Sequence, residues 1–141
     1  MRRQEQAGST RHRILIVDDE ESTRLLLARI VTHDMKVEAT LAGTCEQALR
    51  LASNYVYDAI VLDLMMPGIG GFEVLKEIRA RSPNAHTPVV VVSVLADQQT
   101  MDKTLAAGAN VYLLKPVERR SLVAALKAQL PGRRRTAHPA G

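Results

Sequence analysis

Apolar runs of strand length alternate along the chain with apolar positions at helical spacing. The runs predict five strands, at residues 14–17, 36–41, 58–64, 88–93 and 110–114. After each strand, apolar residues recur every three or four positions and predict a helix. The five helices are expected over 22–32, around 45–52, around 74–78, over 97–107 and around 122–130.

This alternation predicts an α/β fold with a doubly wound, five-stranded parallel sheet. Strands that alternate with helices imply right-handed crossovers, whose helices cover both faces of a parallel sheet. Continuous apolar runs in the first, third and fourth strands agree with burial on both faces. Five units are too few to close an eight-fold barrel, so we expect an open sheet.

Two local signals refine the second helix and the end of the third strand. Thr44, with Gln47 three residues later, is typical of a capping box. Cys45 lies on the apolar face of the helix that follows, where we expect it to fill the core. Pro67 and Gly68 predict a turn directly after the third strand.

The composition favours a single soluble domain. Hydrophobic residues make up 46% of 141, enough for a core, and the single cysteine excludes an internal disulfide. The basic N-terminus lacks the apolar stretch of a secretory signal. No apolar run reaches transmembrane length, so we expect a cytoplasmic protein without membrane insertion.

Positive charge is concentrated at the two ends of the chain. Residues 1–13 and 131–141 each carry +3, against +4 for the whole chain, which leaves −2 for residues 14–130. We expect residues 1–12 and 131–141 to be disordered basic tails around one domain at 13–130. Short basic tails without aromatic residues are weak signals for nucleic acid, so we do not expect nucleic-acid binding.

Polar side chains stand at the carboxyl ends of four predicted strands. Asp18 and Asp19 follow the first strand, Asp63 lies near the end of the third, Ser93 ends the fourth and Lys115 follows the fifth. Each feature alone has an ordinary explanation, such as a helix cap or a strand stop. Because parallel strands end at the same edge of a sheet, the five together predict a site there.

The chemistry of these side chains points to a phosphoryl group and a metal ion. Clustered carboxylates repel one another, and Mg²⁺ would offset that repulsion while keeping room for a phosphoryl oxygen. Asp63 is placed to act as a nucleophile that forms an aspartyl phosphate. Lys115 could pair with the phosphoryl group, and the Ser93 hydroxyl could donate to it.

These motifs resemble the response regulator receiver domain, the phosphoacceptor half of two-component signalling. The similarity lies in ILIVDDE, VLDLMMPG, VVVVS and VYLLKP, and it covers about residues 13–130. The spacings of 44 residues from Asp19 to Asp63, 30 to Ser93 and 22 more to Lys115 are typical of the family. The resemblance implies a flavodoxin-like sheet in strand order 2-1-3-4-5.

The resemblance also implies a role for each matching residue. Asp63 resembles the phosphoacceptor. Asp19 resembles a direct Mg²⁺ ligand, and Asp18 resembles the residue that holds the ion through water. Met65 matches the position whose backbone carbonyl completes the metal site.

Three further residues match the phosphate-binding and switch positions. Lys115 resembles the phosphate-binding lysine, and the family has a cis bond to the proline that follows it. Ser93 resembles the switch hydroxyl, and Tyr112 the aromatic that turns inward when this hydroxyl moves.

Two positions depart from the family pattern. Gly70 stands where Asp or Asn is common, and as a weaker helix cap it predicts a looser loop. Val94 stands where Ala or Gly is common. Its β-branched side chain could narrow access to Asp63, so we expect slow loss of the phosphoryl group.

The expected function is a receiver that takes a phosphoryl group from a histidine kinase or a histidine phosphotransfer protein. It would then change which output protein it binds, through the face of the fourth helix, fifth strand and fifth helix. Receivers can also dimerise through this face on phosphorylation. Such a protein is consumed by its own modification until hydrolysis, so we do not class it as an enzyme.

Other functions compete with this interpretation. The chain could be the receiver portion of a larger DNA-binding regulator or hybrid kinase, or a protein that contacts nucleic acid through its tails. A haloacid-dehalogenase-type phosphatase needs a second Asp two residues after the nucleophile, where this chain has Met65. A dinucleotide-binding protein is disfavoured because no G-x-G-x-x-G follows the first strand.

Overall fold

The computed structural model describes residues 11–130, and its five strands and five helices alternate throughout. The strands are β1 (Arg13–Val17), β2 (Glu38–Ala42), β3 (Ala59–Asp63), β4 (Val89–Ser93) and β5 (Val111–Leu114). The helices are α2 (Glu21–Met35), α3 (Cys45–Asn54), α4 (Gly70–Arg81), α5 (Gln98–Ala106) and α6 (Arg119–Gln129). Every predicted element is present in the predicted order.

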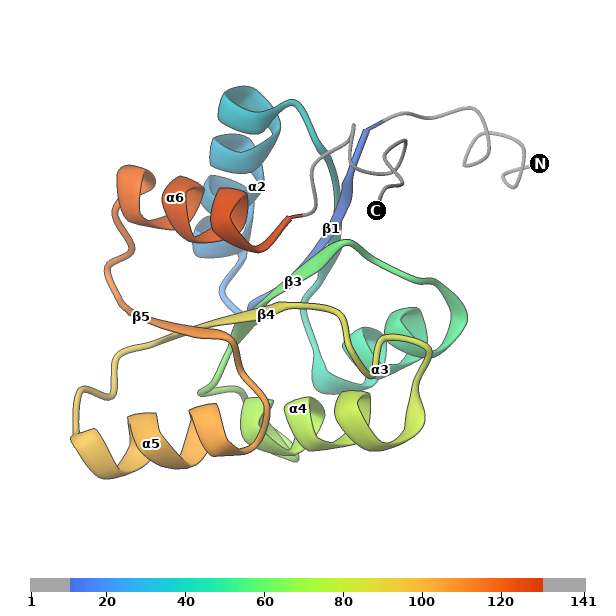
Figure 1. Cartoon of the computed structure of the whole chain (residues 1–141), viewed down its shortest axis with the longest axis vertical. Coiled ribbons are helices and arrows are strands. Elements are labelled where there is room, and N and C mark those ends of the chain that lie inside the picture. Colours follow the sequence, from blue (N-terminus) through green and yellow to red (C-terminus); the bar gives the residue numbers. More distant parts are fainter. Residues whose placement is uncertain (1–10, 131–141) are drawn as a thin grey trace, which may run out of the picture.

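All strand pairs are parallel, and the sheet order is β2-β1-β3-β4-β5. This confirms the flavodoxin-like order. Helices α2 and α6 cover one face of the sheet, and α3, α4 and α5 cover the other (Figure 1). Because β1, β3 and β4 lie inside the sheet, their carboxyl ends meet at the middle of one edge.

Two apolar cores sandwich the sheet, and successive residues of a strand serve opposite cores. In β1, Leu15 and Val17 pack toward α3 and α4, while Ile14 and Ile16 pack toward α2 and α6. Every residue of β3 and β4 is buried. Burial on both faces explains why these strands are continuous apolar runs rather than alternating ones.

The first helix extends three residues beyond the end that its apolar pattern predicts. Helix α2 continues past Thr32 to Met35 and is capped by Lys36, whose φ of 54° is left-handed. The Thr32 hydroxyl donates to the carbonyl of Ala28, so this residue is accommodated within the helix. Strand β2 therefore begins at Glu38, two residues later than predicted.

The predicted cap of α3 is confirmed in a slightly altered form. The amide of Gln47 donates to Thr44 Oγ1 at 3.0 Å. The Gln47 side chain in turn accepts from the amide of Gly43 rather than of Thr44, at 2.9 Å. Cys45 is buried as expected, and its thiol donates to the carbonyl of Pro67.

The predicted tails lie outside the described residues, apart from Arg11 and His12. The carbonyl of His12 accepts from the amide of Glu38 at 2.9 Å, which extends the pairing of β1 with β2. The His12 ring lies 3.6 Å from Asp58. His12, one residue before the predicted domain boundary, is thus already bonded to the sheet. Within residues 11–130, no helix has the length and apolar character needed to cross a membrane.

Candidate functional site

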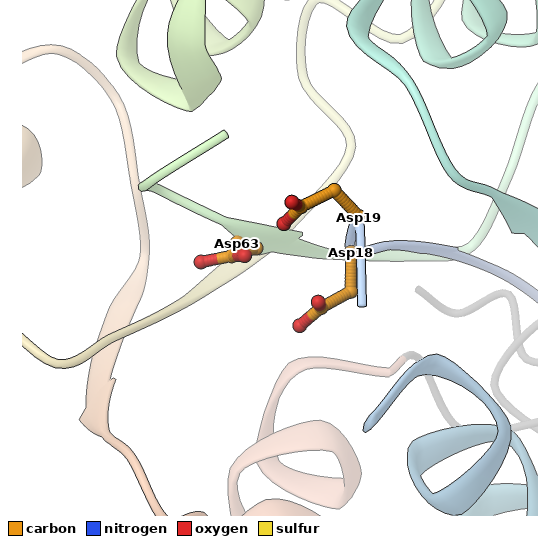
Figure 2. A group of neighbouring side chains, drawn as sticks. All are labelled: Asp18, Asp19 and Asp63. Carbon is orange, nitrogen blue, oxygen red and sulfur yellow. The ribbon is translucent and has the colours of Figure 1, made fainter. Parts of the chain in front are cut away.

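The sheet brings Asp18 and Asp63 to adjacent positions at its carboxyl edge. Val17 pairs with Leu62, so the next residue of each chain segment stands at the same level of the sheet. The amide of Asp18 donates to the carbonyl of Ala42, which carries the β1–β2 ladder one step past the strand. Asp19 adds a third, exposed carboxylate, and one oxygen of each of the three lies within 4.8 Å of the others (Figure 2).

Lys115 enters the site from the end of β5. Its amide donates to the carbonyl of Ser93 at 2.8 Å, which fixes the backbone of this position beside β4. Its Nζ lies 3.0 Å from Asp18 Oδ2 and 3.3 Å from Asp63 Oδ2. The peptide bond from Lys115 to Pro116 is cis, as the resemblance implied.

Asp63 is a buried carboxylate in an unfavourable electrostatic environment. Only 2% of the residue is exposed to solvent. Burial raises the pKa of Asp63, and the nearby charge of Asp18 raises it further. Lys115 and the amide of Met65 act in the opposite direction, and together these effects place the pKa of Asp63 at about 6.

Lys115 is held in its charged form by its neighbours. Burial alone would lower the pKa of this ammonium group. Contact with Asp18 and the charge of Asp63 outweigh burial, so that the pKa of Lys115 lies above its usual value. The ammonium therefore remains a cation across the physiological pH range.

The carboxylates have binding capacity that the protein leaves unused. Asp18 Oδ1 accepts from the amide of Glu20 at 3.0 Å. Asp18 Oδ2 is buried, and within residues 11–130 the ammonium of Lys115, at 3.0 Å, is its one partner. Two buried carboxylates and one exposed carboxylate face a single ammonium, so the site suits an additional cation. Oxygen donors of this kind match the preference of Mg²⁺.

Met65 contributes to the site through its backbone. Its amide donates to Asp63 Oδ1 at 3.2 Å, which orients the carboxylate, while its side chain points to solvent. The other oxygen of Asp63 contacts Lys115. Both oxygens of Asp63 are thus directed by neighbouring groups.

Ser93 and Tyr112 are joined through the backbone of Leu95. The Ser93 hydroxyl accepts from the amide of Leu95 at 3.1 Å, and the hydroxyl of Tyr112 donates to the carbonyl of Leu95 at 2.8 Å. Within residues 11–130, Ser93 makes no hydrogen bond to Asp63. The two predicted switch side chains therefore meet at one residue that the sequence did not single out, because it contributes only main-chain groups.

A hollow of about 320 Å³ opens beside Lys115. Its lining is mainly apolar and includes Leu26 of α2, Val94 and Pro116. Val94 is 62% exposed and lines this hollow at its rim.

Gly71 seats helix α4 on the strand that carries Asp63. Its amide donates to the carbonyl of Leu64 at 2.9 Å. A Cβ at this position would clash with the carbonyl of Asp63 and would lie 2.7 Å from Leu64 Cα. Only glycine fits against the main chain here. Sequence reasoning missed this residue, because a close backbone approach leaves no pattern of its own.

Gly70 stands at the start of α4, and its backbone conformation adds a reason for glycine that the sequence interpretation as a weak cap did not include. The residue that precedes the helix is Ile69, and Gly70 is the first residue of α4 with a φ of +88°. Residues other than glycine rarely adopt this backbone conformation, so glycine is favoured at this position.

Arg24 is a second residue that sequence reasoning missed. It stands on α2, and its Nη1 donates to the carbonyl of Asp18 at 2.7 Å. The available signal was its position five residues after Asp19, on the helix that starts at Glu21.

Known proteins of similar sequence include regulators of signal transduction. The chain is 39% identical over 119 residues to the sensory transduction protein RegX3 of Mycolicibacterium smegmatis, which covers 83% of this chain and 50% of that protein. It is 36% identical over 107 residues to the response regulator PleD of Caulobacter vibrioides, which covers 75% and 23%. The chain thus spans half or less of these two relatives.

Solved structures agree in fold. The receiver domain of sensor histidine kinase PA1611 from Pseudomonas aeruginosa, solved with magnesium in its active-site cleft, is 29% identical, covers 84% of this chain and 97% of that one, and has a TM-score of 0.76. Chemotaxis protein CheY4 of Vibrio cholerae is 28% identical, covers 85% and 99%, and has a TM-score of 0.79.

The family profile described as the response regulator receiver domain matches residues 14–127. Receiver domains are signalling domains of two-component systems rather than classical enzymes. The residues gathered at the carboxyl edge lie within the matched segment. The chain belongs to the response regulator receiver domain family.

Proposed function

We propose that Asp63 accepts a phosphoryl group from a histidine kinase or a histidine phosphotransfer protein. The observation that carries this proposal is the convergence of Asp18, Asp19 and Lys115 on a nearly buried Asp63. A structural ion pair would need one carboxylate for the ammonium of Lys115. This site has three carboxylates and keeps the pKa of Asp63 raised, as is common where a protein performs chemistry.

The transfer exchanges one bond to phosphorus for another. A carboxylate oxygen of Asp63 forms the new O–P bond while the P–N bond to the donor histidine breaks. The imidazole nitrogen leaves with the electron pair of that bond. Lys115 remains protonated and pairs with a phosphoryl oxygen, which compensates the negative charge that arrives.

The acidic residues would hold Mg²⁺ during this transfer. Asp19 and Asp63 are proposed as direct ligands, Asp18 as a ligand through water, and Met65 as a ligand through its backbone carbonyl. The buried Asp18 oxygen, which has only the ammonium of Lys115 as a partner within residues 11–130, supports this assignment. When bound, the ion supplies positive charge that offsets carboxylate repulsion and polarises the phosphoryl group.

Ser93 and Tyr112 are proposed as the switch. A phosphoryl group on Asp63 would attract the Ser93 hydroxyl and draw it from the amide of Leu95. Because Tyr112 holds the carbonyl of the same residue, the change would reach β5. The proposed output face comprises α5, β5 and α6, where a protein partner or a second phosphorylated copy would bind. We propose that the protein acts in the cytoplasm, without binding nucleic acid.

Intact mass after treatment with acetyl phosphate tests the proposal. We expect the mass of one phosphoryl group to be gained with Mg²⁺ and not with a chelator. Asp63→Asn should abolish this gain, whereas Asp102→Asn, at an exposed carboxylate on α5, should preserve it. A gain that persists in Asp63→Asn would contradict the assignment of the acceptor.

A further inference from the structure

Arg24 holds the backbone of the acidic loop from the side of helix α2. Its Nη1 donates to the carbonyl of Asp18 at 2.7 Å, in a partly buried position. On the other side of the same residue, the amide of Asp18 donates to the carbonyl of Ala42. Both main-chain groups of Asp18 are therefore fixed by partners outside the loop.

The guanidinium of Arg24 also packs on the loop that follows β2. A Cβ added to Gly43 would lie 2.9 Å from Arg24 Nη1 and 3.2 Å from Arg24 Cζ. The guanidinium thus lies directly over the bare Cα of Gly43. Arg24 links two loops, one carrying Asp18 and Asp19 and the other leading into α3.

The guanidinium of Arg24 contacts a main-chain carbonyl rather than a carboxylate. Within residues 11–130 Arg24 forms no salt bridge, and its side-chain hydrogen bond goes to a main-chain carbonyl. A cation near three carboxylates opposes the binding of a second cation. By charge alone, Arg24 would weaken the binding of Mg²⁺, so its position calls for a different role.

We infer that Arg24 is a positioning residue for the magnesium site, acting by holding the Asp18 carbonyl and so the direction of the Asp18 and Asp19 carboxylates. This inference rests on the proposed function. Groups that orient metal ligands from outside commonly contribute about tenfold or more to metal affinity. According to this inference, Arg24 raises Mg²⁺ affinity more by positioning the carboxylates than it lowers this affinity by charge repulsion.

The two effects have opposite signs, which makes the inference testable. Arg24→Ala removes the repelling charge and the hydrogen bond together. If positioning dominates, Mg²⁺ binds roughly tenfold more weakly to this variant. Arg24→Lys keeps the charge and one donor, and should recover part of the affinity. Arg29→Ala, which removes an exposed cation from the same helix, should leave the affinity nearly unchanged.

Gly43→Ala provides an independent way to disturb the same contact. The new methyl group would displace the guanidinium without altering Arg24 itself. We expect Gly43→Ala to weaken Mg²⁺ binding in the wild-type background. In the Arg24→Ala background it should have no further effect, because the group it displaces is already gone.

The measurement is isothermal titration of each purified full-length variant with Mg²⁺, beside urea unfolding in a chelator to confirm the fold. The inference is supported if Arg24→Ala binds Mg²⁺ more weakly and Arg24→Lys recovers part of the affinity. It also requires that Gly43→Ala has no further effect in the Arg24→Ala background. Equal or tighter binding in Arg24→Ala overturns it, as does an additive effect of Gly43→Ala. If Arg24→Ala does not fold, Arg24→Lys and Gly43→Ala decide, and wild-type affinity in both overturns the inference.

The wild-type titration separates this inference from the proposed function. A wild-type protein that binds no Mg²⁺ overturns the proposed magnesium site and this inference with it. A wild-type protein that binds Mg²⁺ and is phosphorylated, beside an Arg24→Ala variant of equal affinity, overturns this inference alone.

Discussion

Two buried polar sites in this protein, the Asn84 side chain and the cluster of Asp18, Asp63 and Lys115, differ in how completely their hydrogen-bonding capacity is used. The first surrounds Asn84, which follows α4 and is fully buried. Its amide donates to the carbonyls of Ala52 and Tyr55, at 2.7 and 2.8 Å. Its oxygen accepts from the amide of Tyr57 and the hydroxyl of Thr87. Two donors and two acceptor positions are all that an asparagine side chain has.

The second cluster comprises Asp18, Asp63 and Lys115. Here two buried carboxylates share one ammonium, and the pKa of Asp63 is raised. The comparison shows how burial of polar groups serves two purposes. The satisfied Asn84 side chain fixes the connections of α3 with β3 and β4, whereas the carboxylate cluster keeps capacity for groups that bind and leave.

The largest effect should come from removing the satisfied Asn84 side chain. Asn84→Ala leaves two carbonyls and an amide without their partner, while the Thr87 hydroxyl keeps the carbonyl of Tyr57 as an acceptor. We expect the free energy of unfolding to fall by about 3 kcal/mol or more. Urea unfolding measures this change. Asn54→Ala, at an exposed residue bonded within its own helix, should change stability by about 0.5 kcal/mol or less. A loss in Asn84→Ala as small as that of the control would contradict the comparison.

Neutralising Asp63 in the carboxylate cluster should raise the free energy of unfolding, opposite to the effect of Asn84→Ala. Asp63→Asn removes a carboxylate that burial and Asp18 disfavour, and Lys115 keeps its contact with Asp18. Without Mg²⁺ at pH 7, we expect the free energy of unfolding to rise by about 1–2 kcal/mol. The variant would be more stable and unable to accept a phosphoryl group. A loss of stability would mean that the Asp63–Lys115 pair outweighs the cost of burial.

The same carboxylate should make stability depend on pH. The pKa of Asp63 is about 6 in the folded protein, above its ordinary value near 3.8. Between these values the folded state binds more protons than the unfolded state, so stability falls as pH rises. From pH 5 to pH 7 without metal, Asp63 should lower the free energy of unfolding by about 1 kcal/mol. Urea titrations of the wild type and Asp63→Asn at several pH values isolate this contribution. The prediction is refuted if the free energy of unfolding changes equally with pH in both proteins.

The smallest effect concerns the rim of the site. Val94 lines the hollow beside Lys115, and trimming it should admit water more easily to phosphorylated Asp63. We expect Val94→Ala to lose its phosphoryl group several-fold faster, measured by intact mass over time. Val56→Ala, at an equally exposed valine between α3 and β3, should match the wild type. An unchanged or slower loss in Val94→Ala would show that Val94 does not limit access.

The fold was predictable because each level of the sequence pattern agrees with it. Strands such as Val89–Ser93 are buried on both faces and leave long apolar runs, and the Thr44 cap uses a hydrogen bond specific to its residue type. The ends of α2 and β2 were less predictable, because the helix continues through Thr32 where apolar spacing stops.

At the candidate site, side chains were predictable and main-chain contacts were not. Asp18, Asp63 and Lys115 carry charges that stand out at strand ends, and the sheet brings them together. Leu95 acts through its amide and carbonyl, and Gly71 through the side chain it lacks. Nothing in the residue type reveals such contacts until the backbone is placed.

The seat of Gly71 on the end of β3 has a consequence for how such a protein can diversify. The location of Asp63 is set by main chain against main chain, without help from the side chains at its rim. Met65, Ile69 and Val94 each expose more than half of their surface around it. Mutations at these three positions can reshape what the protein recognises while the nucleophile stays in place. Chemistry and recognition are thereby uncoupled, so that gene duplication could yield copies that answer different donors through the same reaction.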